Sequence, residues 1–266
     1  MDVIHYNSQA WDRQVDKGNE WTQPVSAETI ERARQGDWKI VLTPTLPVPK
    51  SWFGDLKGKK VLCLASGGGQ QAPILAAAGA NVSTLDNSQN QLNRDREVAE
   101  REGLSIDLFQ GDMAKLDMFD EATFDLVFNP CSICFSPNPR QVWKEVARVL
   151  KTGGRMMTGI CNPVLYMMDE DEMIAGRLKV RHKIPYSDER DLPEDQKQRF
   201  VETGEPFAFG HTLDDLLGGI TAAGLAIVRM YEDGFGECDY SHFNEYIKTF
   251  MAVAAVKLPS ELQWAE

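Results

Sequence analysis

Between residues 60 and 161 the chain alternates short apolar runs with longer amphipathic stretches. Segments of strand length lie at residues 60–65, 81–85, 105–110, 124–129 and 155–161, of which 60–65 is an apolar run and 105–110 alternates apolar and polar residues. Stretches with helical periodicity separate them and end near glycines, at residues 70–78, 88–101 and 140–150. Because strands and helices alternate at intervals of roughly 20–30 residues, we predict a doubly wound parallel α/β sheet with right-handed crossovers.

Residues 162–211 interrupt this rhythm. They contain an acidic run at 169–172, a strand-like stretch at 178–184 and a polar stretch at 187–198. An acidic run of this length is typical of a solvated face or a helix start. We interpret the whole segment as an insertion that covers part of the edge of the sheet.

The rhythm resumes after residue 211. A helix is expected at 212–223, followed by strands at 225–231 and 246–257. No helix of useful length fits between these last two strands, so they are expected to be antiparallel neighbours. The prediction is a mostly parallel seven-stranded sheet with an antiparallel last strand. The first 50 residues, rich in Trp and Pro, are predicted to form an irregular arm with a short helix at 27–35.

The strongest local signal is the turn between the first strand and the first helix. Glycines at 67, 68 and 69 let the backbone turn tightly and approach a ligand closely. The helix that follows directs its free amides and positive dipole end at the same place. Asp86 closes the second strand, where a carboxylate can accept hydrogen bonds from both hydroxyls of a ribose. Together these features predict a nucleoside site at the switch point of an open sheet.

This spacing fits two classes of protein. Gly67-x-Gly69-x-x-Ala72 matches the dinucleotide fingerprint of NAD-dependent oxidoreductases. Three further segments favour the other class: residues 111–113 (GDM), residues 124–130 (FDLVFNP) and residues 148–154 (RVLKTGG). In order and spacing they resemble the class I S-adenosylmethionine-dependent methyltransferases, closely over residues 57–161 and loosely over 212–257.

The resemblance implies S-adenosylmethionine as the cofactor, with its methionine half over the turn. The residues expected there are Ala65, Ser66, Gly67, Gly69, Gln70 and Gln71. Two departures stand out, because the family usually has an acid in place of Cys63 and a glycine in place of Ala65. The ammonium of the methionine half is therefore left to backbone carbonyls near Ala65 and Asn129, or to the N-terminal arm.

The resemblance also assigns the adenosine half. Asp86 would hold the ribose hydroxyls, and Asp112 would accept from the adenine amine beside the Met113 amide. Asn87 and Leu92 are expected to flank the adenine ring.

At the reacting end, Asn129 and Pro130 would face the transferred methyl group. Direct displacement at a sulfonium methyl asks the protein mainly to align the acceptor and exclude water. A general base is needed only for a hydroxyl or a protonated amine, and His211 is the candidate. The alternative is that His211 only packs or caps a helix.

The net charge limits the kinds of partner that we expect for this chain. The chain has 40 acidic and 28 basic residues, a net charge of −12, which argues against binding to nucleic acid. Asn129-Pro130 resembles the motif of amino-group DNA methyltransferases, but the stacking ring is displaced to Phe135. We predict a small, neutral or cationic acceptor and no nucleic-acid partner.

The chain shows no apolar run of about 20 residues and no secretory signal, so we expect no membrane partner and a cytoplasmic location. Its five cysteines are interpreted as free thiols. Cys131 and Cys134 have the spacing of a metal or redox pair, but no second pair or histidine lies nearby. We predict that both are buried side chains and that the chain holds no metal.

The predicted function is therefore transfer of a methyl group from S-adenosylmethionine to a small molecule. The alternatives are an NAD-dependent oxidoreductase and a non-catalytic nucleoside-binding protein, the latter suggested by Cys63. The N-terminal arm is expected to act as a lid that meets the insertion above the cofactor. Together they would enclose the acceptor, with Tyr166 and Tyr186 of the insertion as candidate lining residues. The predicted organisation is a lid (1–50), a cofactor-binding half (51–161), a substrate-side insertion (162–211), the rest of the core (212–258) and a tail (259–266).

Overall fold

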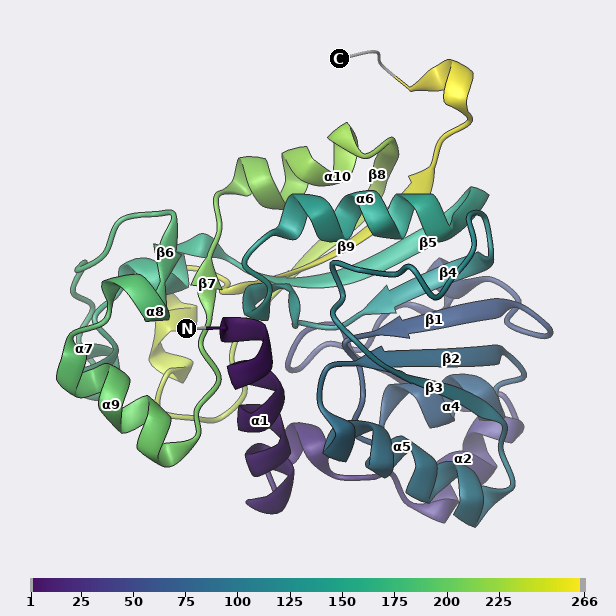
Figure 1. Ribbon diagram of the computed structural model, residues 1–266, viewed down its shortest axis with the longest axis horizontal. Helices are drawn as coiled ribbons and strands as arrows, with labels where there is room; N and C mark the ends of the chain where they lie inside the picture. The colour runs from purple at the N-terminus through teal and green to yellow at the C-terminus, as the bar shows by residue number, and fades with distance from the viewer. Residues whose placement is uncertain (1, 264–266) are drawn as a thin grey trace.

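A computed structural model describes residues 2–263. Seven strands form one sheet in the order β3-β2-β1-β4-β5-β9-β8, which runs from the bottom to the top of Figure 1. The first five strands are parallel, and β9 is antiparallel to both β5 and β8. The predicted fold class is confirmed. The strands are β1 (Lys60–Leu64), β2 (Asn81–Asp86), β3 (Ile106–Gln110), β4 (Phe124–Asn129), β5 (Leu150–Cys161), β8 (Leu225–Asp233) and β9 (Phe250–Lys257).

Both faces of the sheet are buried, because helices cover each of them. On β1, Val61 and Cys63 pack into one core with α2 (Ala27–Arg34), α4 (Gln71–Ala77) and α5 (Gln89–Glu102). Leu62 and Leu64 point to the opposite core, which includes α6 (Pro139–Val149) and the segment 214–222. Side chains alternate between the two faces of a strand, so a buried parallel strand reads as a continuous apolar run.

Capping side chains and glycines fix where the helices begin and end. The Ser88 hydroxyl accepts a hydrogen bond from the Gln91 amide at the start of α5, and Gly103 ends that helix in a left-handed conformation. Thr212 likewise accepts from the Asp215 amide. The helix predicted at 212–223 is instead split, into a π-helical turn η4 (Asp214–Gly218) and α10 (Gly219–Ala222).

The short helix predicted at residues 27–35 is confirmed as α2, but the prediction that the rest of the arm is irregular was wrong. Residues Val3–Asp16 form a 14-residue helix, α1, which is followed by η1 (Glu20–Thr22), α2 and α3 (Lys50–Phe53). The buried positions of α1 do recur at helical spacing, but they include Asn7 and Gln14 among the apolar ones. These two polar residues hid the amphipathic pattern, because their partners lie about 200 residues away.

The insertion also differs from its prediction. Residues 178–184 form no strand, and only Val180 makes an isolated bridge, to Met168. A two-stranded ladder of β6 (Tyr186–Ser187) and β7 (Phe209–Gly210) takes that place. The acidic run starts a helix, as expected, with Asp169 as its cap. The helices of the insertion are η3 (Pro163–Met167), α7 (Glu170–Ile174), α8 (Asp188–Asp191) and α9 (Glu194–Thr203).

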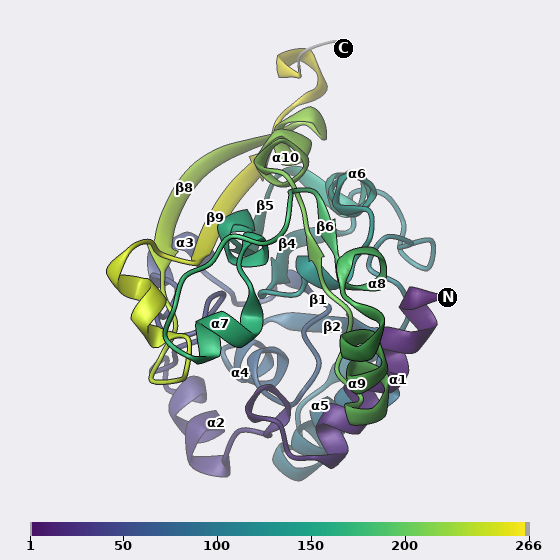
Figure 2. The same ribbon diagram turned by 90° about the vertical axis from the view of Figure 1, so that its left-hand side faces the viewer.

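The first helix of the arm, α1, and the insertion lie side by side at the carboxyl ends of the parallel strands, and not along an edge of the sheet (Figure 1). Figure 2 shows α1 next to α8 and α9. Tyr6, Ala10 and Phe207 form a small core between them, with the rings of Tyr6 and Phe207 stacked at 4.7 Å. Three further turns complete the chain, namely η2 (Ile133–Phe135), η5 (Ser241–Glu245) and η6 (Ser260–Leu262).

Candidate functional site

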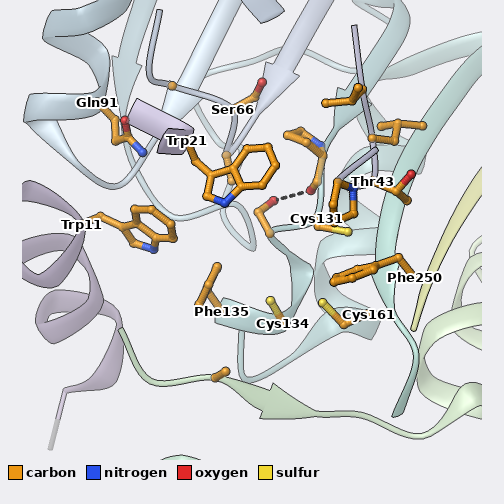
Figure 3. Close-up of a pocket in the computed structure, with 18 of the residues that line it drawn as sticks. Trp11, Trp21, Thr43, Ser66, Gln91, Cys131, Cys134, Phe135, Cys161 and Phe250 are labelled. Carbon is orange, nitrogen blue, oxygen red and sulfur yellow. Dashed lines mark hydrogen bonds between the residues drawn. The ribbon is translucent and has the colours of Figure 1, made fainter. Parts of the chain in front are cut away.

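A cavity of about 670 Å³ opens at the carboxyl ends of the strands. One side of it comes from the turn after β1 and from the segments after β2 and β3. The opposite side comes from the loops after β4 and β5, the insertion and the β8–β9 loop. The arm contributes Trp11 and Trp21, and Figure 3 shows the Trp21 ring between the two sides, with Ser66 above it and Cys134 below. This position is where an open α/β sheet binds its ligands.

The backbone of the turn approaches its neighbours too closely for any side chain. A Cβ on Gly67 would lie 2.7 Å from the Cβ of Gln91 and 3.1 Å from a carboxyl oxygen of Asp86. Gly68 has a φ of +121°, and a Cβ there would lie 2.6 Å from the Trp21 carbonyl oxygen. The Gly69 amide donates to the buried Asp95 carboxyl group at 2.7 Å. The glycines therefore let the turn pack between the arm and α5.

Asp86 is fixed at the end of β2, where it lines the cavity. One carboxyl oxygen accepts from the Gly67 amide at 3.0 Å and the other from the Ser88 amide at 2.9 Å. Burial raises the pKa of Asp86 to about 6, although these amides oppose the shift. Each oxygen still has a free lone pair, so the carboxylate can accept hydrogen bonds from a ligand.

On the side of the cavity that comes from the turn after β1 and the segments after β2 and β3, two buried polar atoms have no hydrogen-bond partner within residues 2–263. They are the hydroxyl of Ser66 and the amide oxygen of Gln91. Buried polar groups are nearly always paired in proteins, so unpaired atoms on one side of a cavity indicate a polar ligand. Two free acceptors beside the Asp86 carboxyl group fit the hydroxyls and amine of an adenosine.

Most residues expected to bind the cofactor do line this cavity: Ala65, Ser66, Gly67, Gln70, Gln71, Asp86, Asn87, Asp112 and Met113. Pro130 also lines it. Gly69 and Leu92 lie behind the wall, Gly69 on Asp95 and Leu92 fully buried at the start of α5. Their predicted contacts with the cofactor stay predictions, as do those of the lining residues.

Asn129 is completely buried behind Pro130. Its amide nitrogen donates to the Leu64 carbonyl and to the Ser132 hydroxyl, both at 2.8 Å. Its amide oxygen accepts from the Thr158 hydroxyl at 2.9 Å. Asn129 thus ties the ends of β1, β4 and β5 together and holds the loop that carries Pro130. Its predicted contact with the methyl group is untested.

His211 is also buried, one residue behind the cavity wall. Its Nε2 lies 2.9 Å from the carbonyl oxygen of Ser136, which lines the cavity, and must donate to it. Burial lowers the pKa of His211, so the ring is neutral near pH 7. The geometry gives it a packing contact, and its predicted role as a base is untested.

Three thiols meet in the cavity wall opposite Ser66. Cys131, Cys134 and Cys161 point into the same region (Figure 3). Hydrogen bonds from the Cys131 and Cys134 thiols hold the pKa of Cys161 well below its usual range, and the same bonds raise the pKa of both donors. All five cysteines are free, as predicted. The prediction of two buried side chains was wrong for Cys131, which is partly exposed in the cavity.

Within the described residues, no group of His, Cys, Asp or Glu side chains is arranged to hold a metal ion. No helix in residues 2–263 combines the length and apolar character of a membrane span.

Sequence reasoning missed two lining segments, residues 41–44 and 235–238. Asp233 joins the loops that carry them, because its carboxyl group accepts from the amides of Thr45 and Leu46 at 2.8 and 3.0 Å. Neither segment has a motif. The only signal was position, since the second follows a strand at the end of the sheet where ligands bind.

The arm is attached directly to the glycine turn. The side-chain amide of Gln70 donates to the carbonyl oxygens of Glu20 and Gln23, at 2.8 and 3.1 Å. The Val25 amide donates to the Gly69 carbonyl at 2.9 Å. The side-chain amide of Gln70 is therefore bonded to the arm. These bonds hold Trp21 of the arm over the glycine turn.

The chain resembles known methyltransferases along most of its length. Residues 62–158 match the family model described as a methyltransferase domain. The chain is 46% identical to the uncharacterized methyltransferase YbaJ of Bacillus subtilis, over 96% of this chain and 99% of that protein. It is 38% identical to the sterol 24-C-methyltransferase of Aspergillus fumigatus over 105 residues, which are 38% of this chain and 28% of that enzyme.

Among solved structures, an S-adenosylmethionine-dependent methyltransferase from Mesorhizobium loti has a similar fold. The TM-score is 0.59 at 19% identity, with 78% of this chain and 94% of that chain covered.

Proposed function

The chain belongs to the class I S-adenosylmethionine-dependent methyltransferases, and on that premise we propose that it methylates a small-molecule acceptor held opposite the glycine turn. The family uses S-adenosylmethionine, so the oxidoreductase alternative no longer applies. The observation that carries the proposal is the cavity of about 670 Å³ with two chemically different sides. A volume in this range suits small ligands and not a polymer.

The unpaired atoms of the cavity wall fit the cofactor. We propose that Asp86 accepts from the ribose hydroxyls, with the free acceptor of Gln91 and the hydroxyl of Ser66 close by. Asp112 and Met113 would hold the adenine edge, since both line the same side. The cofactor supplies a methyl group on a positively charged sulfur. The turn of residues 65–69 has no side chain larger than that of Ser66, so its backbone can lie against the cofactor.

The other side of the cavity is proposed to hold the acceptor. Pro130 follows the last residue of β4 on this side, where it can align the acceptor with the methyl group. Trp11 and Trp21 of the arm, and Tyr166 of the insertion, would exclude water from the reacting atoms. Exclusion of water matters because the chemistry depends chiefly on alignment.

We propose the same partners and compartment as the sequence indicated. The net charge of −12 and the absence of basic residues among those lining the cavity support a reaction without nucleic acid. The free thiols support a reducing, cytoplasmic compartment.

Two measurements test the proposal. Calorimetric titration with S-adenosylmethionine and S-adenosylhomocysteine should give dissociation constants in the micromolar range, which correspond to binding free energies on the order of −8 kcal/mol. A screen of small acceptors with labelled methyl donor should then detect transfer. Binding without transfer to any acceptor would favour a non-catalytic nucleoside-binding protein, and failure to bind either compound would contradict the proposal.

A further inference from the structure

The side of the cavity opposite the glycine turn, called here the acceptor side, has a distinct composition. It is formed by residues 41–44, 130–132 and 134–136, Cys161, Tyr166, Ala208, residues 235–238, Tyr240 and Phe250. Five aromatic rings line it, those of Phe135, Tyr166, Phe235, Tyr240 and Phe250. This surface therefore suits a ligand with an apolar body.

Every charged side chain that lines the cavity is acidic. Glu20, Asp86 and Asp112 lie on the arm and the cofactor side, and Glu237 lies on the acceptor side. No lysine, arginine or histidine is among the described residues of the lining. Glu237 forms no ion pair with any residue between 2 and 263, so its charge is available to a ligand.

Two neighbouring groups, the Glu170 carboxylate and the Cys161 sulfur, are also acceptors. Glu170 lies directly behind Tyr240 and accepts a hydrogen bond from its hydroxyl at 3.0 Å. Cys161 accepts hydrogen bonds from the Cys131 and Cys134 thiols, which hold its pKa well below the usual range. A carboxylate or phosphate moved from water to this surface would find no positively charged side chain to replace its hydration. A cation would find Glu237, Cys161 and the faces of the aromatic rings.

We infer that the methyl acceptor is a small amine with an apolar body, positively charged in solution, and that the acceptor side rejects anionic analogues. This inference rests on the proposed function. Methyl transfer to such an amine balances simply. The ammonium first loses one proton to water, and its nitrogen then bonds to the methyl carbon as the carbon–sulfur bond breaks. The products are an N-methylammonium and S-adenosylhomocysteine.

The test compares acceptors that differ only in charge. Protein saturated with S-adenosylhomocysteine is titrated calorimetrically with tryptamine, tryptophol and indole-3-acetate, and with phenethylamine, 2-phenylethanol and phenylacetate. At least one amine should bind, at least tenfold more tightly than its carboxylate and severalfold more tightly than its alcohol. Binding of the carboxylate or alcohol as tightly as the amine, or binding of neither amine, would overturn the inference. Failure of S-adenosylhomocysteine itself to bind would instead contradict the proposed function.

Variants of this chain test which residues distinguish the amine from the carboxylate. Glu237→Gln should weaken amine binding severalfold, and Glu237→Lys should reverse the preference between amine and carboxylate. Glu245→Gln is the matched control, because Glu245 lies in the same loop but outside the cavity lining. Cys161→Ser should also weaken amine binding, since Cys161 lines the acceptor side. Unchanged selectivity in Glu237→Lys and in Cys161→Ser, both with normal binding of S-adenosylhomocysteine, would show that these residues do not recognise the acceptor.

Discussion

Asn7 and Phe207 exchange two hydrogen bonds across 200 residues of sequence. The Asn7 side-chain amide donates to the Phe207 carbonyl oxygen at 2.8 Å, and the Phe207 backbone amide donates to the Asn7 side-chain oxygen at 2.8 Å. An asparagine side chain here pairs like a strand backbone and satisfies both polar groups of a buried residue. This pair joins the middle of α1 to the insertion.

The opposite side of α1 binds the cofactor half of the core. The Ser8 hydroxyl donates to the Asn87 carbonyl at 2.7 Å, and the Asp12 carboxylate accepts from the Ser88 hydroxyl at 2.6 Å. One helix therefore connects the end of β2 with the insertion, directly beside the cavity. This is the geometry of a lid that both ligands would meet.

Asn7→Ala should destabilise the protein by about 2–4 kcal/mol, because it leaves the buried amide and carbonyl of Phe207 without partners. Chemical unfolding monitored by circular dichroism measures the change. Gln9→Ala is the control, since Gln9 is exposed on the same helix and bonds only to His5. Equal stability of the two variants would show that the pair contributes nothing.

Deleting residues 1–25 should abolish methyl transfer, because the deletion removes Trp11 and Trp21 from the cavity and opens it to water. Binding of S-adenosylhomocysteine should weaken less than in Asp86→Ala. Trp11→Ala provides a milder test in a folded chain, since its ring contacts Phe135 at 5.2 Å across the cavity. Full activity of the shortened protein would mean that the arm serves stability alone.

Asp86→Ala should weaken binding of S-adenosylhomocysteine about tenfold to hundredfold, or roughly 1.5–3 kcal/mol, through loss of charge-assisted hydrogen bonds to the ribose. Asp86→Asn should be milder, because its amide oxygen still accepts. Calorimetry gives the affinities, and near-ultraviolet circular dichroism checks the fold. An Asp86→Ala protein that is folded and binds like the wild type would place the ribose elsewhere.

The same residue predicts a pH dependence. Burial raises the pKa of Asp86 to about 6, so the carboxyl group takes up a proton as the pH falls below that value. Ribose hydroxyls donate best to the ionised form, so affinity for S-adenosylhomocysteine should fall between pH 7 and 5. Calorimetry across that range measures the effect, and Asp86→Asn should flatten it.

The sequence could predict the sheet because its information is local. The strands from β1 to β5 are short segments with apolar or alternating patterns, and the capping hydroxyl of Ser88 needs only a residue three positions away. The glycine turn and Asp86 were found for the same reason, since the turn after β1 and the end of β2 are adjacent in a parallel sheet.

The arm and the acceptor side could not be predicted in the same way. Asn7 gains its partner only through a residue 200 positions away, and polar residues on its helix mask the apolar stripe. Residues 178–184 have the composition of a strand, but no partner strand lies beside them, and only Val180 is bridged. The thiols of Cys131 and Cys161 meet because β4 and β5 are neighbours, which spacing along the chain does not reveal.

Asp95→Asn should stabilise the protein above pH 7. Asp95 is fully buried beneath the glycine turn, and burial raises its pKa from an ordinary 3.8 to about 8. The folded state therefore holds a proton that the unfolded chain has already released, so stability falls as the pH rises from about 4 to 8. Each unit of pKa shift is worth about 1.4 kcal/mol, which makes the expected gain on the order of several kcal/mol at pH 9.

The asparagine oxygen can still accept from the Gly69 amide, so the turn should keep its shape. Unfolding experiments at pH 5 and pH 9 measure the difference between wild type and variant, which should be small at pH 5. A variant less stable than the wild type at pH 9 would mean that the carboxylate is ionised and stabilising.

Ala65→Gly should stabilise the protein by about 1 kcal/mol. Ala65 has a φ of +47°, in the left-handed region where a Cβ is strained and glycine is not. Its amide is held by the Leu85 carbonyl at 2.7 Å, so the residue cannot relax to a negative φ without breaking the end of β1 from β2.

Ala122→Gly is a matched comparison, because Ala122 has a φ of +51° outside the cavity lining and should gain a similar amount. Ala76→Gly, within α4, should lose about 1 kcal/mol. Thermal unfolding of the three variants distinguishes strain relief from the general cost of glycine, and destabilisation of Ala65→Gly to the extent of Ala76→Gly would show that the turn stores no strain at this residue.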